Sequence, residues 1–212
     1  MHSMKGTIKL ISYPARPTNG GSLEYAAPKN GLWMWEPKIN GHRVMLHLPT
    51  LTMFNRQGEV YSHSDRFTLA AAKAAGLFKD HTWLDCEALG LRGALGNNSL
   101  VVLDLPVRYV SQGERKGALS WMMEGRELPR PAEFRPELEP ESVYSLHHLV
   151  THPALLLTHT LEAWWEQMQE FNRVNNMEFF EGFVAKAVNV EYPMQLESPT
   201  KEFPLWVKHR FN

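Results

Sequence analysis

The sequence has a single cysteine, Cys86, among 212 residues, so no disulfide can form within the chain. It has no run approaching the roughly 18 consecutive apolar residues of a membrane span. The first ten residues lack the apolar stretch of a secretory signal. These absences predict a protein of the reducing cytoplasm that does not bind a membrane.

An excess of charge of one sign is also missing. The chain has 22 Lys and Arg residues against 23 Asp and Glu, a formal net charge of −1. The overall field therefore does not attract nucleic acid, and any such binding must come from a local basic cluster. A glycine-rich phosphate-binding loop is absent as well, so a nucleotide site would have to be built from side chains.

The length and composition suit one globular domain covering residues 1–212. Aromatic residues make up 11% of the chain, and 212 residues are enough to bury a sizeable core. Strand-like runs and helical patterns are mixed rather than strictly alternating, which favours an α+β fold with antiparallel sheets. We predict strands over residues 32–36, 42–48, 51–54, 83–91, 99–110, 182–190 and 205–211, and helices over 65–75, 141–152 and 161–175. Residues 128–140 carry four prolines, which predicts an exposed loop between two lobes.

Lys38 stands out among the residues that could carry chemistry. It lies between two strand-like runs and is followed closely by Asn40-Gly41, a pair that readily adopts positive φ and could fold the chain sharply beside the lysine. A lysine held near other cations has a lowered pKa and can act as a nucleophile. The alternative is an ordinary lysine in a β-hairpin.

Three further strand-like runs each carry a pair of charged residues. Asp85 and Glu87 lie at i and i+2, on one face of a strand, and buried acids are costly unless they bind a metal or cations. Glu181 and Lys186 bracket an otherwise apolar run. Lys208 and Arg210 share a strand face, where two cations repel each other unless an anion lies between them. The alternative for the first and third pairs is a strand edge with its polar face in water, and for Glu181 and Lys186 it is two charges at the ends of a core strand.

Arg56 follows a strand and precedes the turn residue Gly58. Its guanidinium fork is suited to phosphate or carboxylate oxygens. The alternative is an ordinary arginine in a surface turn. The pair Arg115-Lys116 is preceded by Glu114 and is interpreted as a solvated turn.

Taken in order, these segments resemble the motifs of the ATP-dependent DNA ligase, RNA ligase and mRNA capping enzyme superfamily. The similarity runs from residue 32 to the end and is closest to a minimal ATP-dependent DNA ligase. In this chain the matching segments are KING at 38–41 with Arg43 (for KxDG), NRQG at 55–58 (for SRxG), LDCEAL at 84–89 (for LDGEL), VVLDL at 101–105, EGFVAK at 181–186 (for EGLVLK) and WVKHR at 206–210 (for WLKLK).

This resemblance implies an α+β fold with two antiparallel β-sheets flanked by helices, an ATP-grasp-like nucleotidyltransferase domain. It also implies a reaction in which Lys38 attacks the α-phosphate of ATP, expels pyrophosphate and becomes linked to AMP. The AMP would pass to the 5′-phosphate of a nick, and the 3′-hydroxyl would then seal the strand. Most of the rate would come from electrostatic stabilisation.

The resemblance also assigns roles to residues. Lys208 and Arg210 would hold the α-phosphate, and Lys186 would support the nucleotide. Glu87 and Glu181 would serve the ribose and a Mg²⁺ ion. Further residues expected at the nucleotide are Arg43 and Arg56, which would also contact the acceptor strand, and Glu36, Pro37, Ile39 and Leu103, which would lie near adenine.

Four positions depart from the motifs. Asn40 stands for the usual Asp and removes a negative charge, and Arg210 stands for a lysine. Cys86 stands for a glycine and should pack on the face opposite Asp85 and Glu87. Leu103 stands where an aromatic would stack on the base, a contact worth about 1–3 kcal/mol.

DNA ligases and capping enzymes carry an OB-fold domain after the last motif, whereas we expect this protein to consist of the adenylation domain without a C-terminal OB-fold domain. We therefore expect a monomer that acts on nicked duplex DNA in preference to RNA, with a protein partner supplying the OB-domain functions, in a prokaryotic or viral setting. The alternatives are an RNA ligase or end-repair enzyme, a guanylyltransferase, or a non-catalytic nucleotide-binding or nucleic-acid-binding module.

Overall fold

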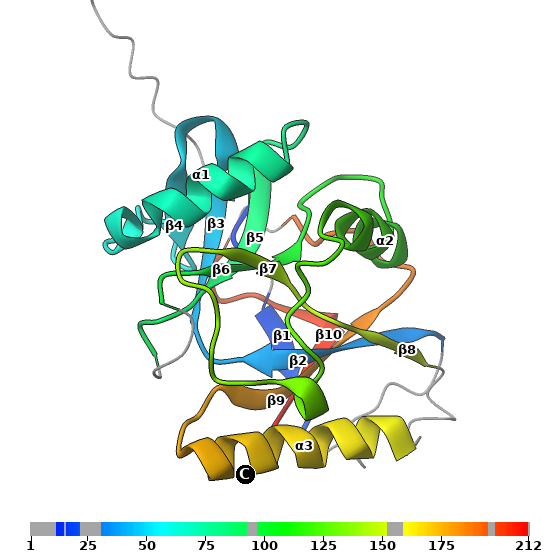
Figure 1. Ribbon diagram of the computed structural model, residues 1–212. Coiled ribbons are helices and arrows are strands. Elements are labelled where there is room, and N and C mark those ends of the chain that lie inside the picture. The colour runs from blue at the N-terminus through cyan, green and yellow to red at the C-terminus, as the bar shows by residue number, and fades with distance from the viewer. Residues whose placement is uncertain are drawn as a thin grey trace, which may run out of the picture.

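The computed structural model describes residues 12–14, 16–21, 31–92, 97–151, 159–194 and 198–211. Two five-stranded sheets dominate this part of the chain (Figure 1). The first sheet has the order β1-β10-β9-β2-β8 and the second has the order β4-β3-β5-β6-β7.

The strands of the first sheet are β1 (Arg16–Asn19), β10 (Glu202–Arg210), β9 (Phe180–Ala187), β2 (Trp33–Ile39) and β8 (Leu149–Thr151). Those of the second sheet are β4 (Thr52–Asn55), β3 (His42–His47), β5 (Trp83–Ala88), β6 (Leu100–Asp104) and β7 (Val143–Ser145). The expected α+β fold with two sheets is confirmed. Most pairs are antiparallel, but β1–β10 and β6–β7 are parallel, so each sheet is mixed.

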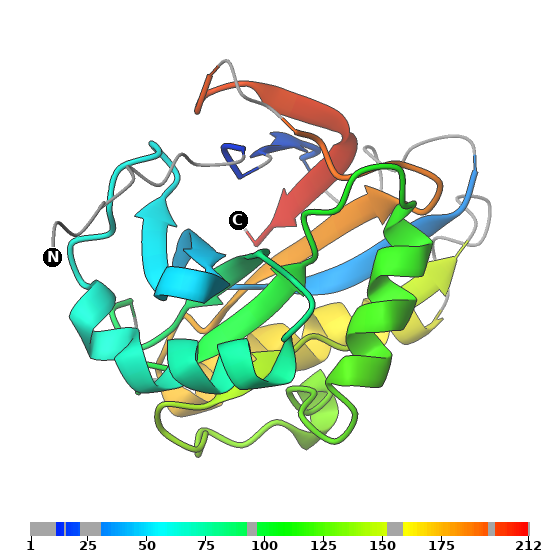
Figure 2. The ribbon, with the colours of Figure 1, turned by 90° about the horizontal axis from the view of Figure 1, so that it is seen from above.

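In the described part of the chain, three α-helices flank the sheets: α1 (Thr68–Leu77), α2 (Gln112–Met122) and α3 (His159–Asn175). The helix α1 packs its alanines into the apolar cluster of the second sheet, whereas α3 covers the first sheet at the opposite side of the molecule (Figures 1 and 2). None of the helices in the described part of the chain has the length and apolar character that a membrane crossing requires.

The apolar stripe that predicted α3 is buried as expected. Leu161, Trp164, Met168 and Phe171 are all buried, and their spacing of three or four residues places them on one helix face. Cys86 is also fully buried, in the apolar cluster under α1 and away from the polar face of β5. Burial raises the pKa of its thiol well above the ordinary value.

Several local predictions are wrong. The helix predicted over residues 141–152 does not form. This segment contains β7, which forms an edge of the second sheet, and β8, which forms an edge of the first. His152 lies outside the described residues. The strand predicted over 99–110 ends at Asp104. The segment 128–140 is not simply exposed, since Leu128, Pro131 and Phe134 are buried. Phe134 packs against aromatic side chains of α3 and β9.

The helix α2 was not anticipated, although its start has a clear signal. Ser111 and Glu114 form a capping box, with the Ser111 side chain accepting from the backbone of Glu114. The helix lacks the apolar periodicity that would predict it, because its buried face carries charged side chains. Arg115 and Lys116 are each 1% exposed, so the interpretation of this pair as a solvated turn is also wrong.

Candidate active site

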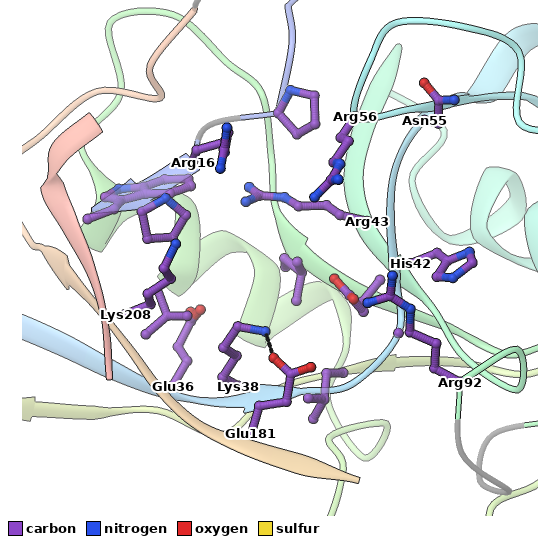
Figure 3. A pocket seen from close by; sticks show the side chains of 18 of the residues that line it. Arg16, Glu36, Lys38, His42, Arg43, Asn55, Arg56, Arg92, Glu181 and Lys208 are labelled. Atoms are coloured by element: carbon purple, nitrogen blue, oxygen red, sulfur yellow. Dashed lines mark hydrogen bonds and ion pairs between the residues drawn. The ribbon is translucent and has the colours of Figure 1, made fainter. Parts of the chain in front are cut away.

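A pocket of about 620 Å³ opens between the two sheets (Figure 3). Its walls come from β1, β2, β9 and β10 of the first sheet and from β3, β4, β5 and β6 of the second. Every site residue expected from the sequence lines this pocket: Glu36, Pro37, Lys38, Ile39, Arg43, Arg56, Glu87, Leu103, Glu181, Lys186, Lys208 and Arg210. Expected site residues that are up to 174 positions apart in the sequence (Glu36 and Arg210) therefore meet at one cavity.

Lys38 and Glu181 form an ion pair at the floor of the pocket (Figure 3). Lys38 is opposite Gly182 and Ile39 is opposite Phe180, so Glu181 is the extra residue of a β-bulge in β9. Such a bulge redirects a side chain, and here it turns Glu181 toward Lys38. Arg210 lies 3.4 Å from the same Glu181 carboxylate.

Gly182 makes this bulge possible. It has a φ of +129°, and a Cβ atom at this position would overlap the carbonyl oxygen of His209 in the neighbouring strand β10. The close approach of β9 and β10 therefore depends on the missing side chain.

The Asn40-Gly41 pair connects the two sheets instead of closing a hairpin, since β2 and β3 belong to different sheets. Neither residue adopts positive φ, so the expected left-handed turn is wrong. Gly41 is required for space, because a Cβ atom there would lie 2.7 Å from the carbonyl oxygen of Ala88 and from Cγ of Glu87. The Asn40 amide donates to the carbonyl oxygen of Glu178 at 2.9 Å, outside the pocket wall.

Glu87 reaches the pocket from β5. Burial raises its pKa to about 7, against the opposing influence of Lys38 and Arg43, and the neighbouring charges of Asp85 and Glu181 add to the increase. Glu87 is therefore close to half-protonated near neutral pH in the absence of a bound cation.

Two carboxylates that face one pocket fit a Mg²⁺ ion, which proteins commonly bind through one or two carboxylates together with substrate phosphates and water. Glu87 and Glu181 are these two groups. Among the described residues, no group of three or more His, Cys, Asp or Glu side chains is arranged to hold a metal. An all-protein metal cage is thus absent from the described part of the chain.

Arg43 is held in place by Asp85. Its Nε and Nη2 atoms donate to the two carboxylate oxygens at 2.9 and 2.5 Å, and the Tyr192 hydroxyl donates to Asp85 at 2.7 Å. The guanidinium lies 5.6 Å from the centre of the Trp206 ring. Burial alone would lower the pKa of Arg43, but the ion pair with Asp85 raises it above its ordinary value. Asp85 thus positions a cation at the pocket.

A buried ion cluster, defined as Glu36, Asp104, Arg115, Lys116 and Lys186, extends from the pocket wall, which Glu36 and Lys186 line, to the helix α2 behind it. Lys116 and Lys186 contact the two oxygens of the Glu36 carboxylate at 2.5 and 3.0 Å. Arg115 donates to Asp104 at 2.8 Å. Although burial raises the pKa of Glu36, its two lysine partners bring it below the ordinary value. The Glu36 carboxylate, expected near adenine, is thus already ion-paired.

Several cations of the pocket were not anticipated from the sequence. Arg16 lines the pocket from β1, which pairs with β10, and Arg92 lines it from the segment after β5 (Figure 3). His63 lines it from the segment after β4. Burial lowers the pKa of Lys208, and the nearby Arg210 lowers it further. Burial and the charges of Arg92 and His63 likewise lower the pKa of His42.

Crowded cations facing one cavity favour an anionic ligand with several charges, such as a polyphosphate. The missed basic residues Arg16, His63 and Arg92 all lie outside the motif segments. Arg16 was hidden because its place at the pocket depends on a parallel strand pair formed across 186 residues (Arg16 and Glu202).

Comparison of the sequence with protein families and with curated proteins gives no match. Solved structures give matches over nearly the whole chain. The ligase domain of M. tuberculosis LigD is 16% identical with a TM-score of 0.58, over 94% of this chain and 60% of that one. Chlorella virus DNA ligase-adenylate is 12% identical with a TM-score of 0.52, over 95% of this chain and 68% of that one. An archaeal ATP-dependent RNA ligase is 13% identical with a TM-score of 0.52, over 94% of this chain and 48% of that one.

The chain therefore has the nucleotidyltransferase fold found in ATP-dependent DNA and RNA ligases. It spans only part of each of these proteins, and it spans 47% of a further similar structure, Pmar-Lig_PreS3, which is 16% identical with a TM-score of 0.58 over 96% of this chain.

Proposed function

We propose that this chain is an ATP-dependent polynucleotide ligase that forms a lysine–AMP intermediate on Lys38 and seals nicks between a 5′-phosphate and a 3′-hydroxyl. The observation that carries the proposal is the position of Lys38 in a cation-lined pocket between two sheets of the ligase fold. A nucleophilic amine, an adjacent carboxylate and surrounding cations are the groups that nucleotidyl transfer needs.

In the first step, Nζ of Lys38 bonds to the α-phosphorus as the bond to pyrophosphate breaks, and the amine loses a proton. The Glu181 carboxylate contacts this amine, so it orients the nucleophile and can accept the proton. Lys208 and Arg210 would neutralise charge on the α-phosphate from β10. Glu87 and Glu181 would hold Mg²⁺, which supplies further charge neutralisation when bound.

The base would lie against Leu103 and Val184, which line the pocket from β6 and β9. Both are aliphatic, so the base would be held by packing without an aromatic stack. Arg43 and Arg56 would contact the ribose and the 5′-phosphate of the acceptor.

DNA is the preferred substrate in this proposal, because Arg43 and the Arg56 segment resemble DNA ligase motifs. The fold shared with an archaeal RNA ligase makes RNA the second candidate. Sealing rates on nicked DNA, nicked RNA and hybrid duplexes would discriminate between them, and labelling with GTP would test for a guanylyltransferase. A monomer in the cytoplasm, with a partner protein supplying OB-domain functions, completes the proposal.

The deciding experiment is incubation of the protein with radiolabelled ATP and Mg²⁺. A phosphoramidate on lysine is labile in acid and stable in alkali, and peptide mapping should place it on Lys38. Lys38→Ala should give no adduct, and Lys79→Ala, an exposed lysine after α1, is the matched control. Absence of an adduct on the wild type, or an adduct that persists in Lys38→Ala, contradicts ligase activity. ATP binding without an adduct would favour a binding module.

A further inference from the structure

The buried ion cluster has more positive than negative groups. Among the described residues that compose it, three cations (Arg115, Lys116 and Lys186) contact two carboxylates (Glu36 and Asp104), which leaves one positive charge unbalanced. All five residues are at most 3% exposed. Because a buried charge is costly without a partner, the surplus positive charge makes this place suited to an anion.

The pairing distances identify which cation is the surplus one. Lys116 is 2.5 Å from Glu36, and Arg115 is 2.8 Å from Asp104, so each carboxylate has one close cation from α2. Lys186 is farther from both, at 3.0 Å from Glu36 and 3.7 Å from Asp104. It is shared between the two carboxylates rather than committed to one.

Lys186 is also the cation of this cluster that faces the pocket. It lines the cavity together with Glu36 and lies 4.5 Å from the centre of the Trp206 ring, whereas Lys116 and Arg115 stand behind the wall on α2. If Lys116 were absent, Glu36 would be a buried carboxylate with a single remaining partner. Lys186 would then be drawn fully onto Glu36 and away from the pocket.

We propose that Lys116, a residue of α2 outside the pocket, is a positioning residue that neutralises Glu36 and thereby leaves Lys186 available to a phosphate group of the nucleotide. Arg115 does the same for Asp104. This inference rests on the proposed function only in naming the ligand as a nucleoside polyphosphate. The specific consequence is that Lys116 affects the phosphate part of binding and leaves the nucleoside part unchanged.

The test compares the affinities of the full-length protein for ATP and for adenosine, measured by calorimetry without Mg²⁺. Lys116→Met should weaken ATP binding about ten-fold or more, the size of one charged hydrogen bond, and change adenosine binding less than about two-fold. The double variant Glu36→Gln/Lys116→Met should recover most of the ATP affinity, because no acid remains to hold Lys186. Lys116→Arg, which keeps the charge, should remain close to the wild type.

Arg173→Met is the matched control, since Arg173 forms an exposed ion pair with Glu170 on α3. Unchanged ATP affinity in Lys116→Met, equal losses of ATP and adenosine, or no recovery in the double variant would overturn the inference. Thermal unfolding checks that each variant is folded; if Lys116→Met does not fold, Lys116→Gln and the double variant take its place. If the wild type binds ATP but forms no adduct on Lys38, only the proposed ligase activity is refuted. If the wild type binds no ATP, the ligase activity and the role of Lys116 are both refuted.

Discussion

The Glu181 carboxylate contacts the Lys38 ammonium from the extra residue of a β-bulge, so a backbone irregularity creates the central ion pair of the pocket. In a regular strand pair, successive side chains alternate between the two faces of the sheet. The bulge breaks this alternation at one position of β9 and lets an acid and a lysine from neighbouring strands point toward one another.

Removing the charge of Glu181 should impair the first chemical step. In Glu181→Gln, Lys38 loses its orienting carboxylate and its proton acceptor, so adduct formation should slow by about 10²–10⁴-fold. The pair is about one-fifth exposed, so the free energy of unfolding should change by only about 1 kcal/mol or less. Single-turnover labelling with ATP measures the first effect and urea unfolding the second. Labelling at the wild-type rate would remove Glu181 from the mechanism.

Gly182 should be intolerant of even the smallest side chain. Gly182→Ala forces a Cβ atom into the His209 carbonyl and a left-handed backbone onto alanine, so we expect a loss of roughly 3 kcal/mol or more. Gly76→Ala is the matched control, because no atom lies within 4 Å of a Cβ there and the position is in α1. This control should be neutral or stabilising by about 0.5–1 kcal/mol. Equal stability of the two variants in denaturant titrations would refute the argument.

Glu87 should make stability depend on pH near neutrality. Its pKa in the folded state is about 7, above the ordinary 4.5, so the folded protein holds this proton more tightly than the unfolded chain. The stabilisation from the neutral carboxyl is complete below pH 4.5 and is lost as the pH rises through 7. Glu87→Gln should therefore exceed the wild type in stability by roughly 1–3 kcal/mol at pH 8, with little difference at pH 4.5.

This pH effect is measured by urea unfolding with a chelator present, since a bound cation would stabilise the charged form of Glu87. Glu162→Gln is the control, because Glu162 is an exposed carboxylate on α3. A constant difference between Glu87→Gln and the wild type across this pH range would contradict the raised pKa.

Asp85 should matter more for stability than its hydrogen-bond partner Tyr192. Asp85→Asn leaves the Arg43 guanidinium without its counter-charge, and breaking such a buried pair costs about 3–5 kcal/mol. Tyr192→Phe removes only one hydrogen bond to Asp85 and should cost about 1–3 kcal/mol. Chemical denaturation of both variants measures the difference, and a larger loss in Tyr192→Phe would contradict it.

The sequence predicts the pocket far better than it predicts some of the elements around it. Every expected site residue lines the cavity, because short motifs such as the Lys38 and Glu181 segments combine reactive side chains with the glycines that let strands approach closely. The α3 stripe was also readable, because apolar side chains at helical spacing indicate a buried face directly.

The predictions for β7, β8 and α2 failed for one physical reason, which is that these elements depend on contacts with other parts of the chain. The strands β7 and β8 are each three residues long and exist because they extend the edges of sheets formed elsewhere, which no local pattern records. Lys116 is buried with Glu36, which meets it from the distant strand β2, and Arg115 is buried with Asp104 at the end of the preceding strand β6. Hydrophobic periodicity cannot detect a helix whose buried face is charged.

The buried Cys86 gives this protein its own labelling probe. It is the single thiol of the chain, and it lies at full burial between Asp85 and Glu87 on the central strand of the second sheet. A thiol reagent can modify it only when that strand opens, so the modification rate reports how often the wall of the pocket comes apart. A ligand that binds only the closed state will slow the modification by a factor of 1 + [L]/Kd. The modification rate of Cys86 therefore measures how much of the pocket is occupied by ligand, and no cysteine has to be introduced by mutation.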